Sequence, residues 1–505
     1  MLELWTHNAP MLVLLTPFCG GLLTLTLRNG PLGMQRLVAV LVTALHSVLG
    51  VTLAASAFDG ITWVYRLGDW AAPWGIVLVV DALTGWMLGV LSILSIPALM
   101  YAFGGTDAQG RHFHTLFQFQ LFGLTGAFLT GDLFNLFVFF EVLLIASYGL
   151  ALHGPGASRT RFGLHYVTLN LSGSAIFLVA VALIYAGLGT LNLADMARTS
   201  ALLDPDRMGL VRMGAVLLLV VFGLKAAAAP MSLWLPGIYT HCSAPVAALF
   251  AIMTKVGVYA IVRLHALVFP ANDPHLGDLY TPWLLISGVI TLGVGMLRAM
   301  VAGRLSAITA ALVVASVGNL LIGLSLGSQA WSATLYYLAH STLVSALLFL
   351  MADGLASART ERKDYLRPGP VFKNHAMWAT AFVVTAIWAA GLPPSSGFLA
   401  KIMLLQAAQP KWYVWLPILV GSFLGILTLA RAGKTLFLNN TLATQQTDAP
   451  SSTYSRWSLA SMAWLGVALL IYTAWTSTFQ NLGGRIAHQL ATPTSYIHAV
   501  LGTKP

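Results

Sequence analysis

The chain has 505 residues, of which 58% are hydrophobic and 8% are charged, and its formal net charge is +10 at pH 7. Soluble domains carry about 25% charged residues, so the composition excludes an ordinary soluble protein and indicates an integral membrane protein. We read the positive charge through the sidedness of a bilayer and not as nucleic-acid binding.

Apolar runs of about 20 residues alternate with short polar links, which predicts transmembrane α-helices and not the roughly 10-residue alternating strands of a barrel. We therefore expect an all-α integral membrane protein with about 14 transmembrane helices. Lys and Arg gather on alternate links, so both termini should lie outside and the basic link 353–373 in the cytoplasm. The expected spans are 9–27, 35–57, 79–103, 113–130, 132–151, 162–188, 210–229, 243–267, 280–300, 304–325, 332–352, 374–392 continuing to 407, 411–433 and 457–480.

The whole chain, 1–505, is expected to form one transmembrane domain. Its first residues, M-L-E-L-W-T-H-N, lack a basic n-region, so we expect a retained first helix and not a cleaved signal. The expected parts are helices 1 to 3 in 1–111, a first repeat in 112–267, a second repeat in 280–435 and helix 14 in 457–480.

Proline interrupts two of the expected spans, and each interruption has a lysine nearby. The first reads K-A-A-A-A-P-M-S-L-W-L-P over 225–236, and the second reads G-L-P-P-S-S-G-F-L-A-K over 391–401. Backbone freed at membrane depth is tolerated only against protein or water, and paired interrupted helices point to the transport sites of repeat-built transporters. We therefore predict two structural repeats, helices 4 to 8 and helices 9 to 13.

Four charged side chains are expected deep within spans: Glu141, Lys225, Lys255 and Lys401. Glu141 follows the soluble edge at Asp132 by roughly 13 Å of helix, close to the middle of a hydrocarbon core ~30 Å thick. An unpaired charge at a helix centre costs about 2.5 to 3.5 kcal/mol on insertion scales, so these side chains should not face lipid. Arg263 is expected closer to the end of its helix.

Two interpretations of these charges remain open. Glu141 and one lysine could form a static pair that holds helices together, but one acid cannot neutralise three lysines. The functional interpretation is a proton path. Burial favours the neutral form of lysine and glutamate, and a nearby opposite charge favours the charged form, so a change in either can switch their protonation. An arginine could not serve, because it stays protonated.

A proton path also needs polar groups between its charged members, and several spans provide them. His340 is the strongest of these candidates because histidine titrates near neutral pH, and we weigh it equally as a relay group and as a structural one. The remaining candidates are Tyr166, Asn170 and Ser174 with His165 beside them, Thr309, Ser316 and Asn319, Ser341 and Ser345, and His265 at an exit. His153 is expected at the interface, and Asp81 is expected to cap helix 3.

The sequence carries no sign of a cofactor or a bound metal. Cys19 and Cys242 are too few for a disulfide framework and have no metal-ligand spacing. No P-loop or redox motif is visible, and the glycines occur singly or in helix-packing patterns. We therefore expect no cofactor and no metal site.

Four segments carry a resemblance to a known family, and together they lie within residues 80–435. They are T-G-D-L-F-N-L-F-V-F-F-E-V-L-L-I-A-S-Y, L-K-A-A-A-A-P-M-S-L-W-L-P, T-K-V-G-V-Y-A-I-V-R and G-L-P-P-S-S-G-F-L-A-K. The chain resembles the proton-translocating antiporter-type subunits that Mrp cation/proton antiporters share with respiratory complex I. The strongest likeness is to the D-subunit family of the Mrp antiporters, which are also called Pha antiporters.

The resemblance implies inverted repeats and discontinuous helices 7 and 12. It also implies that Glu141 on helix 5 faces Lys225 on helix 7, that Lys255 is the central lysine of helix 8, and that Lys401 is the lysine of helix 12. In that family the chain works with several other membrane subunits in the bacterial inner membrane, and proton influx drives Na⁺ or K⁺ out.

This chain departs from the family pattern at two positions. Many relatives carry a lysine or histidine about five residues after the helix 11 histidine, where this chain has Ser345. Relatives often have an acidic-basic pair before helix 10, where V-A-G-R-L-S leaves Arg304 alone.

We therefore predict a proton-translocating subunit of a multisubunit Na⁺ (or K⁺)/H⁺ antiporter, which is a secondary transporter and not an enzyme. The alternative is a proton-pumping membrane subunit of complex I (NADH–quinone oxidoreductase) or of a related membrane hydrogenase. A third reading is a scaffold whose buried charges are purely structural. The expected partners are other membrane subunits, protons, Na⁺ or K⁺, and the lipid bilayer, with no nucleic acid.

Overall fold

The computed structural model describes residues 2–502 except 271–276, 278, 360–361 and 440–454. Its first half contains α1 (Leu2–Thr26), α2 (Leu32–Phe58), β1 (Trp63–Arg66), β2 (Val77–Val80), α3 (Ala82–Ala102), α4 (Phe113–Leu129), α5 (Leu133–Ala151), α6 (Ala157–Leu188), α7 (Leu193–Ser200), α8 (Met208–Ala226), α9 (Trp234–His241), α10 (Ala244–Phe250) and α11 (Met253–Leu267). The second half contains α12 (Thr281–Val301), α13 (Leu305–Leu324), α14 (Ser328–Ala358), α15 (His375–Ala390), α16 (Ser396–Ala407), α17 (Trp412–Gly433), α18 (Arg456–Ala474), α19 (Thr476–Ala491) and α20 (Thr494–Leu501).

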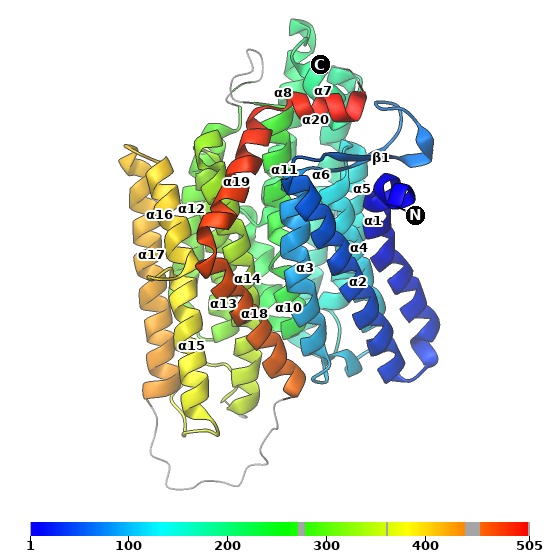
Figure 1. The fold of residues 1–505 in the computed structure, drawn as a ribbon. Helices are drawn as coiled ribbons and strands as arrows, with labels where there is room; N and C mark the ends of the chain where they lie inside the picture. Colours follow the sequence, from blue (N-terminus) through cyan, green and yellow to red (C-terminus); the bar gives the residue numbers. More distant parts are fainter. Residues whose placement is uncertain (1, 271–276, 278, 360–361, 440–454, 503–505) are drawn as a thin grey trace.

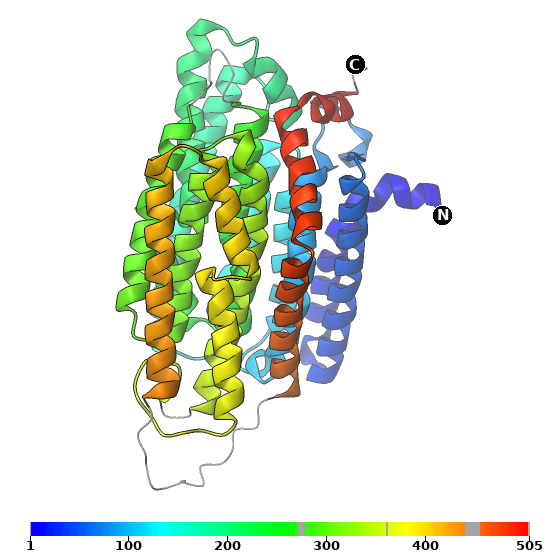
Figure 2. The same cartoon turned by 60° about the vertical axis from the view of Figure 1, so that its left-hand side comes forward.

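The long helices run side by side and form an elongated bundle (Figures 1 and 2). Within the described residues, twelve helical segments are long and apolar enough to cross a membrane, and α15 and α16 are two shorter apolar helices. This architecture confirms the expected all-α membrane fold. The count of about 14 spans and the two inverted repeats stay predictions.

A small antiparallel hairpin is the one β-sheet that the described residues form. β1 pairs with β2, with Trp63 opposite Val80 and Arg66 opposite Val77. The predicted span 79–103 was therefore wrong at its start: V-L-V-V is rich in β-branched residues and forms a strand, and α3 begins only after Asp81. The Asp81 side chain accepts a hydrogen bond from the Thr84 amide and caps this helix, as expected.

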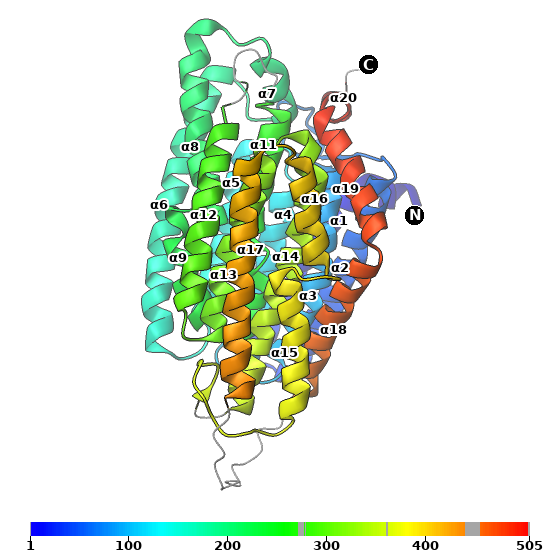
Figure 3. The ribbon, with the colours of Figure 1, turned by 90° about the vertical axis from the view of Figure 1, so that its left-hand side faces the viewer.

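Both predicted interruptions are present. α8 ends at Ala226, Ala227 takes a left-handed conformation with φ of 60°, and α9 starts only at Trp234. α15 ends at Ala390, where Gly391 has φ of 74°, and α16 starts at Ser396. Figure 3 shows α15 and α16 meeting at mid-height in the bundle, so this break lies at membrane depth.

Two further interruptions were not predicted. The expected span 243–267 is divided into α10 and α11 around Ala251 and Ile252, and the expected span 457–480 is divided into α18 and α19 at Trp475. None of the three residues is a proline or glycine, so no local breaking signal marks these positions. After α19, the short α20 lies across the end of the bundle beside α7 (Figure 1).

The helices that carry two of the buried lysines, α8 and α11, meet at a glycine. A Cβ atom on Gly257 would lie 2.6 Å from the backbone nitrogen of Ala226 and 2.7 Å from the backbone oxygen of Phe222. Both atoms belong to the backbone of α8, so they cannot rotate away. The close approach of α8 and α11 therefore requires glycine at this position.

We predict that Gly257→Ala destabilises the protein by about 1 to 3 kcal/mol, because the added methyl group forces α11 away from α8. Thermal denaturation in detergent, followed by the amount of monodisperse protein that remains, measures this effect. Gly293→Ala is the matched control, since a Cβ atom on Gly293 of α12 would meet nothing within 4 Å. Equal stability of the two variants would contradict the packing argument.

Candidate functional site

Glu141 on α5 and Lys225 on α8 are joined through a serine on α6. The Ser174 hydroxyl donates a hydrogen bond to Oε1 of Glu141. Lys225 Nζ donates to Ser174 Oγ at 3.3 Å and to the backbone oxygen of Asn170 at 3.2 Å. The two charges therefore face each other as the resemblance implies, but a hydroxyl group separates them and they do not form a direct ion pair.

Helix ends place both of these charged groups. The Asp132 side chain accepts a hydrogen bond from the Asn135 amide at 2.8 Å and fixes the start of α5, so that Glu141 comes in its third turn. Lys225 is in the last turn of α8, next to the interruption. The partial negative charge at a helix C-terminus stabilises an ammonium group there, which reduces the cost of burying Lys225.

Lys255 is fully buried in the first turn of α11 and contacts α13. Its Nζ donates to Ser316 Oγ at 3.0 Å, and that hydroxyl donates to the Val313 backbone oxygen at 2.7 Å. Of the other two predicted polar residues on α13, Asn319 donates to the Tyr337 hydroxyl at 3.0 Å. Thr309 bonds only to the backbone of its own helix. Ser316 is thus the predicted residue that contacts the central lysine.

Lys401 on α16 and His340 on α14 lie at the second interruption. Lys401 Nζ donates to the backbone oxygen of Ala390, the last residue of α15, at 2.8 Å. His340 Nδ1 lies 2.9 Å from Ser396 Oγ at the start of α16. The second interruption therefore brings a lysine ammonium to the C-terminal end of a half-helix, where backbone carbonyl groups accept its hydrogen bonds. At the first interruption, by contrast, the Lys225 ammonium donates to a backbone oxygen within α6.

A cavity connects the central lysine's partner to the second interruption. It has a volume of about 30 Å³, and its polar lining is Ser316, Tyr337, His340, Ser341, Ser345 and Lys401. A polar cavity needs roughly 10 to 15 Å³ for each water, so this one has room for about two. Ser345, which stands where relatives have a titratable residue, is part of the lining. Water can therefore link Ser316 to Lys401.

The remaining predicted polar residues lie outside this row. His165 is exposed on the outer face of α6, so its placement beside the relay was wrong. The Tyr166 hydroxyl pairs with Ser147 Oγ at 2.7 Å, and its ring stacks on Trp234. His265 is buried, with its ring stacked against that of Tyr280. His153 is buried as well, and one of its ring nitrogens lies 3.1 Å from the Thr106 backbone oxygen.

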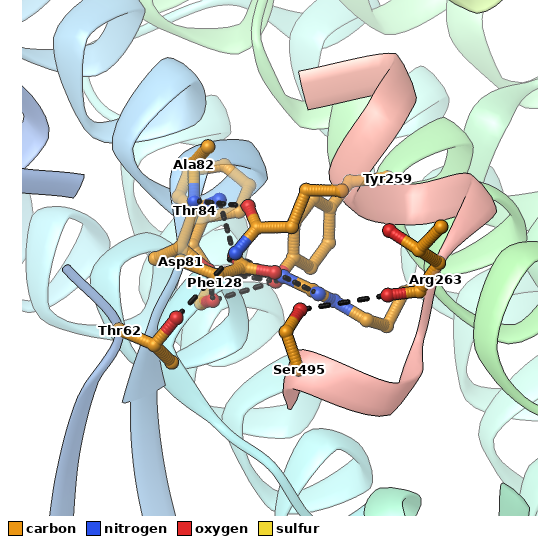
Figure 4. A network of polar contacts seen from close by, with 10 residues as sticks. Thr62, Asp81, Ala82, Thr84, Phe128, Tyr259, Arg263 and Ser495 are labelled. Carbon is orange, nitrogen blue, oxygen red and sulfur yellow. Dashed lines mark hydrogen bonds and ion pairs between the residues drawn. The ribbon is translucent and has the colours of Figure 1, made fainter. Parts of the chain in front are cut away.

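A second buried charge network, which the sequence analysis missed, holds Arg263 (Figure 4). Arg263 on α11 donates to both carboxylate oxygens of Asp81, at 2.5 and 2.8 Å, and also to the hydroxyl groups of Thr84 and Tyr259, both at 3.1 Å. The Tyr259 hydroxyl donates to the Phe128 backbone oxygen at 2.6 Å. Arg263 is therefore fully neutralised, and Asp81 has a structural partner besides its role as a helix cap.

The C-terminal segment closes this network. The Gln489 side chain on α19 accepts a hydrogen bond from the Ala82 amide at 3.1 Å. The guanidinium of Arg263 lies 5.3 Å from the ring centroid of Tyr496 on α20, within the range of a cation–π contact. The network thus ties α3, α11 and the last two helices together. Asp81 and Arg263 were both visible in the sequence, but nothing in the sequence indicated that they pair.

Three more ion pairs, around two carboxylates, lie at the opposite end of the bundle. Arg304 is paired with Asp364 at 3.0 Å, so the expectation that it stands alone was wrong: its partner is supplied by the link 353–373. Asp107, in the loop before α4, accepts from Arg36 and contacts His114. Burial opposes its ionisation, but the hydrogen bonds from His114 and Arg36 outweigh burial and hold the pKa of Asp107 below its usual value.

The choice of partner separates the arginines from the lysines. Among the described residues, every ion pair uses arginine or histidine: Arg36, His114, Arg198, Arg263 and Arg304. The three deep lysines instead donate to hydroxyl groups or backbone oxygens. A lysine in such surroundings can lose its proton without leaving a carboxylate unpaired.

Comparison with known proteins identifies the family. The family model described as NADH:quinone oxidoreductase/Mrp antiporter, transmembrane, matches residues 130–428. The chain belongs to this family. The matched region contains Glu141, Lys225, Lys255, His340 and Lys401, whereas the hairpin, Asp81 and the C-terminal helices lie outside it.

Individual members of the NADH:quinone oxidoreductase/Mrp antiporter family are similar over much of the chain. A probable K⁺/H⁺ antiporter D subunit from Rhizobium meliloti is 41% identical over 73% of this chain and 72% of its own length. A Na⁺/H⁺ antiporter D subunit from Bacillus subtilis is 31% identical over 98% of this chain and 99% of its own. A chain of the Mrp complex from Dietzia has a TM-score of 0.88 with 27% identity, covering 98% of this chain and 99% of that one.

We predict that Arg263→Met destabilises the protein by about 3 to 5 kcal/mol, because it leaves the buried Asp81 carboxylate without its partner. Thermal denaturation in detergent measures the loss. The double variant Asp81→Leu with Arg263→Met should recover most of the stability, since it leaves no buried charge behind. Arg28→Met, at an exposed arginine, is the matched control. A single variant as stable as this control would show that the pair is not structural.

Proposed function

We propose that the chain is the D subunit of an Mrp-type antiporter and that it translocates protons in exchange for Na⁺ or K⁺. The observation that carries this proposal is a row of titratable groups without a direct ion pair among them: Lys225 and Lys255 are buried, and Glu141 and Lys401 are partly buried. Relatives named as K⁺/H⁺ and Na⁺/H⁺ antiporter subunits support it.

At the first end of the row, the Ser174 hydroxyl lies between Glu141 and Lys225 and can pass a proton between them. It accepts from Lys225 Nζ while it donates to Glu141 Oε1, so moving both protons by one bond transfers a positive charge from the lysine to the carboxyl group. The exchange needs no displacement of helices. It converts a charged pair into a neutral one.

In the rest of the row, the lysines act on each other through charge. Two unit charges at ~4 Å and an effective dielectric of about 20 interact by about 4 kcal/mol, and the interaction falls inversely with distance. A proton that leaves Lys225 therefore favours protonation at Lys255, and the Ser316 hydroxyl and the water cavity extend this coupling to His340 and Lys401. His340 borders the cavity and serves as a second proton acceptor there.

We also propose the membrane in which the chain works and the subunits with which it works. It is a multi-pass protein of the bacterial inner membrane, and it functions with other membrane subunits as a secondary transporter and not as an enzyme. Proton influx supplies the driving force for the export of Na⁺ or K⁺, so the row needs no cofactor. The redox-driven alternative, a proton-pumping subunit of complex I or of a membrane hydrogenase, uses the same row with a different energy source.

Glu141→Ala and Lys225→Ala should each abolish Na⁺- or K⁺-dependent proton exchange in membrane vesicles, while the complex still assembles, because each removes one end of the first proton transfer. Exchange is measured by the fluorescence of a pH-sensitive dye after addition of the cation. Lys373→Ala, at an exposed lysine on the link 353–373, is the control and should exchange normally.

Full exchange in both Glu141→Ala and Lys225→Ala would refute the relay. Purification of the native complex separates the two energy sources. Copurification of flavin or iron–sulfur subunits would favour the redox-driven alternative.

A further inference from the structure

An oxygen-lined cavity lies between α3, α14 and α18, at the end of the bundle that is predicted to face the cytoplasm. Its volume is about 130 Å³, and its polar lining is Tyr101, Thr106, Asp353, Ser357, Ser455 and Ser458. The other lining residues are glycine, tryptophan and methionine, so Asp353 is the only charged residue in the lining among the described residues. Within that part of the chain, the cavity offers one carboxylate and several hydroxyl groups, and no ammonium or guanidinium group.

Asp353 is exposed although it belongs to the most enclosed long helix. The most apolar stretch of α14 is entirely buried, whereas the Asp353 side chain is accessible because it also borders a second cavity of about 510 Å³. The Tyr101 hydroxyl lies 2.9 Å from Asp353 Oδ2 and 3.1 Å from the Leu350 backbone oxygen. The carboxylate thus lies where the larger cavity, which we call the vestibule, meets the smaller oxygen-lined cavity.

The basic residues that line the vestibule either bond to groups other than Asp353 or lie outside the oxygen-lined cavity. Arg304 is paired with Asp364. Arg159 donates to the backbone oxygens of His153 and His241. Lys363 lines the vestibule but not the oxygen-lined cavity, and in the described part of the chain Asp353 belongs to none of the ion pairs. A water-accessible carboxylate without a basic partner can take up either a proton or a cation from the solvent.

We propose that the cavity lined by Tyr101, Asp353 and Ser458 binds a partly hydrated alkali cation, Na⁺ or K⁺. Carboxylate, hydroxyl and carbonyl oxygens are the ligands that hard cations prefer. At roughly 10 to 15 Å³ for each water, the cavity has room for the ion with most of a hydration shell. This inference rests on the proposed function and extends it, because it places a site for the transported cation within the same chain as the proton row.

The position of the site couples it to that row. Asp353 and Ser345 are both on α14, about 12 Å apart along the helix axis, and Ser345 lines the water cavity at Lys401 and His340. A cation at Asp353 repels protons from the near end of the row, and a protonated Asp353 does not bind the cation. One carboxylate therefore excludes simultaneous occupancy by the two exchanged ions.

Equilibrium binding of radioactive sodium, and separately of rubidium as a potassium tracer, to the purified complex tests the site. We expect Asp353→Asn to lower the affinity for one of these ions at least tenfold at alkaline pH, and Tyr101→Phe to lower it several-fold. Binding to the unmutated complex should weaken as the pH falls, because protons compete for the carboxylate. Asp353→Glu should retain binding, and Asp206→Asn, in an exposed turn far from the site, is the matched control.

Unchanged binding of both ions in Asp353→Asn and Tyr101→Phe, compared with Asp206→Asn, would overturn the proposal. If Asp353→Asn fails to assemble, Tyr101→Phe decides the question, since it keeps the aromatic ring and the carboxylate. The Glu141→Ala complex should bind the cation normally. Full exchange in both Glu141→Ala and Lys225→Ala would refute the proton relay, while lost cation binding in Asp353→Asn would still support this site, so the two failures are distinguishable.

Discussion

A charged side chain within a hydrocarbon layer has to be solvated by the protein, and the placement of the buried lysines follows from that requirement. Lys225 and Lys401 lie where a helix has been interrupted, and both donate to backbone oxygens. At the second break the oxygen belongs to the last residue of α15, so the partial charge of the helix terminus also acts on the ammonium. The prolines and glycines of the two interruptions are therefore part of the charge-bearing machinery.

The protein uses arginine and lysine for different tasks. Arg263 and Arg304 form ion pairs with Asp81 and Asp364, and these pairs fasten helices or links to each other. Because arginine stays protonated, such contacts are permanent. The deep lysines are bonded to Ser174, Ser316 and the Ala390 backbone oxygen, and these partners tolerate a neutral amine as well as an ammonium. Arginine thus forms the static ion pairs, and lysine occupies the positions of the proposed proton path.

The sequence was informative wherever a strong energetic conflict lies within one segment. Glu141 and the three lysines stood out because each is a charge in an apolar run, and both interruptions followed from proline. Family resemblance added that Glu141 faces Lys225. The sequence did not reveal the Asp81–Arg263 pair, the Arg304–Asp364 pair or the two cavities at Asp353, because these depend on which distant segments meet. The strand Val77–Val80 escaped because its apolar residues were read as the start of a span, although β-branched residues favour a strand. The breaks at Ala251 and Trp475 escaped because no proline or glycine marks them.

The central claim is that the buried lysines give up and regain protons, and Lys255→Arg tests it most directly. Arginine keeps the positive charge and can donate to Ser316, but it does not release a proton in the membrane interior. The relay account predicts that a fully assembled complex with Lys255→Arg has no cation-dependent proton exchange in proteoliposomes, as does one with Lys255→Met. Exchange restored by Lys255→Arg and absent in Lys255→Met would contradict the account, because it would show that only a fixed positive charge is needed at this position.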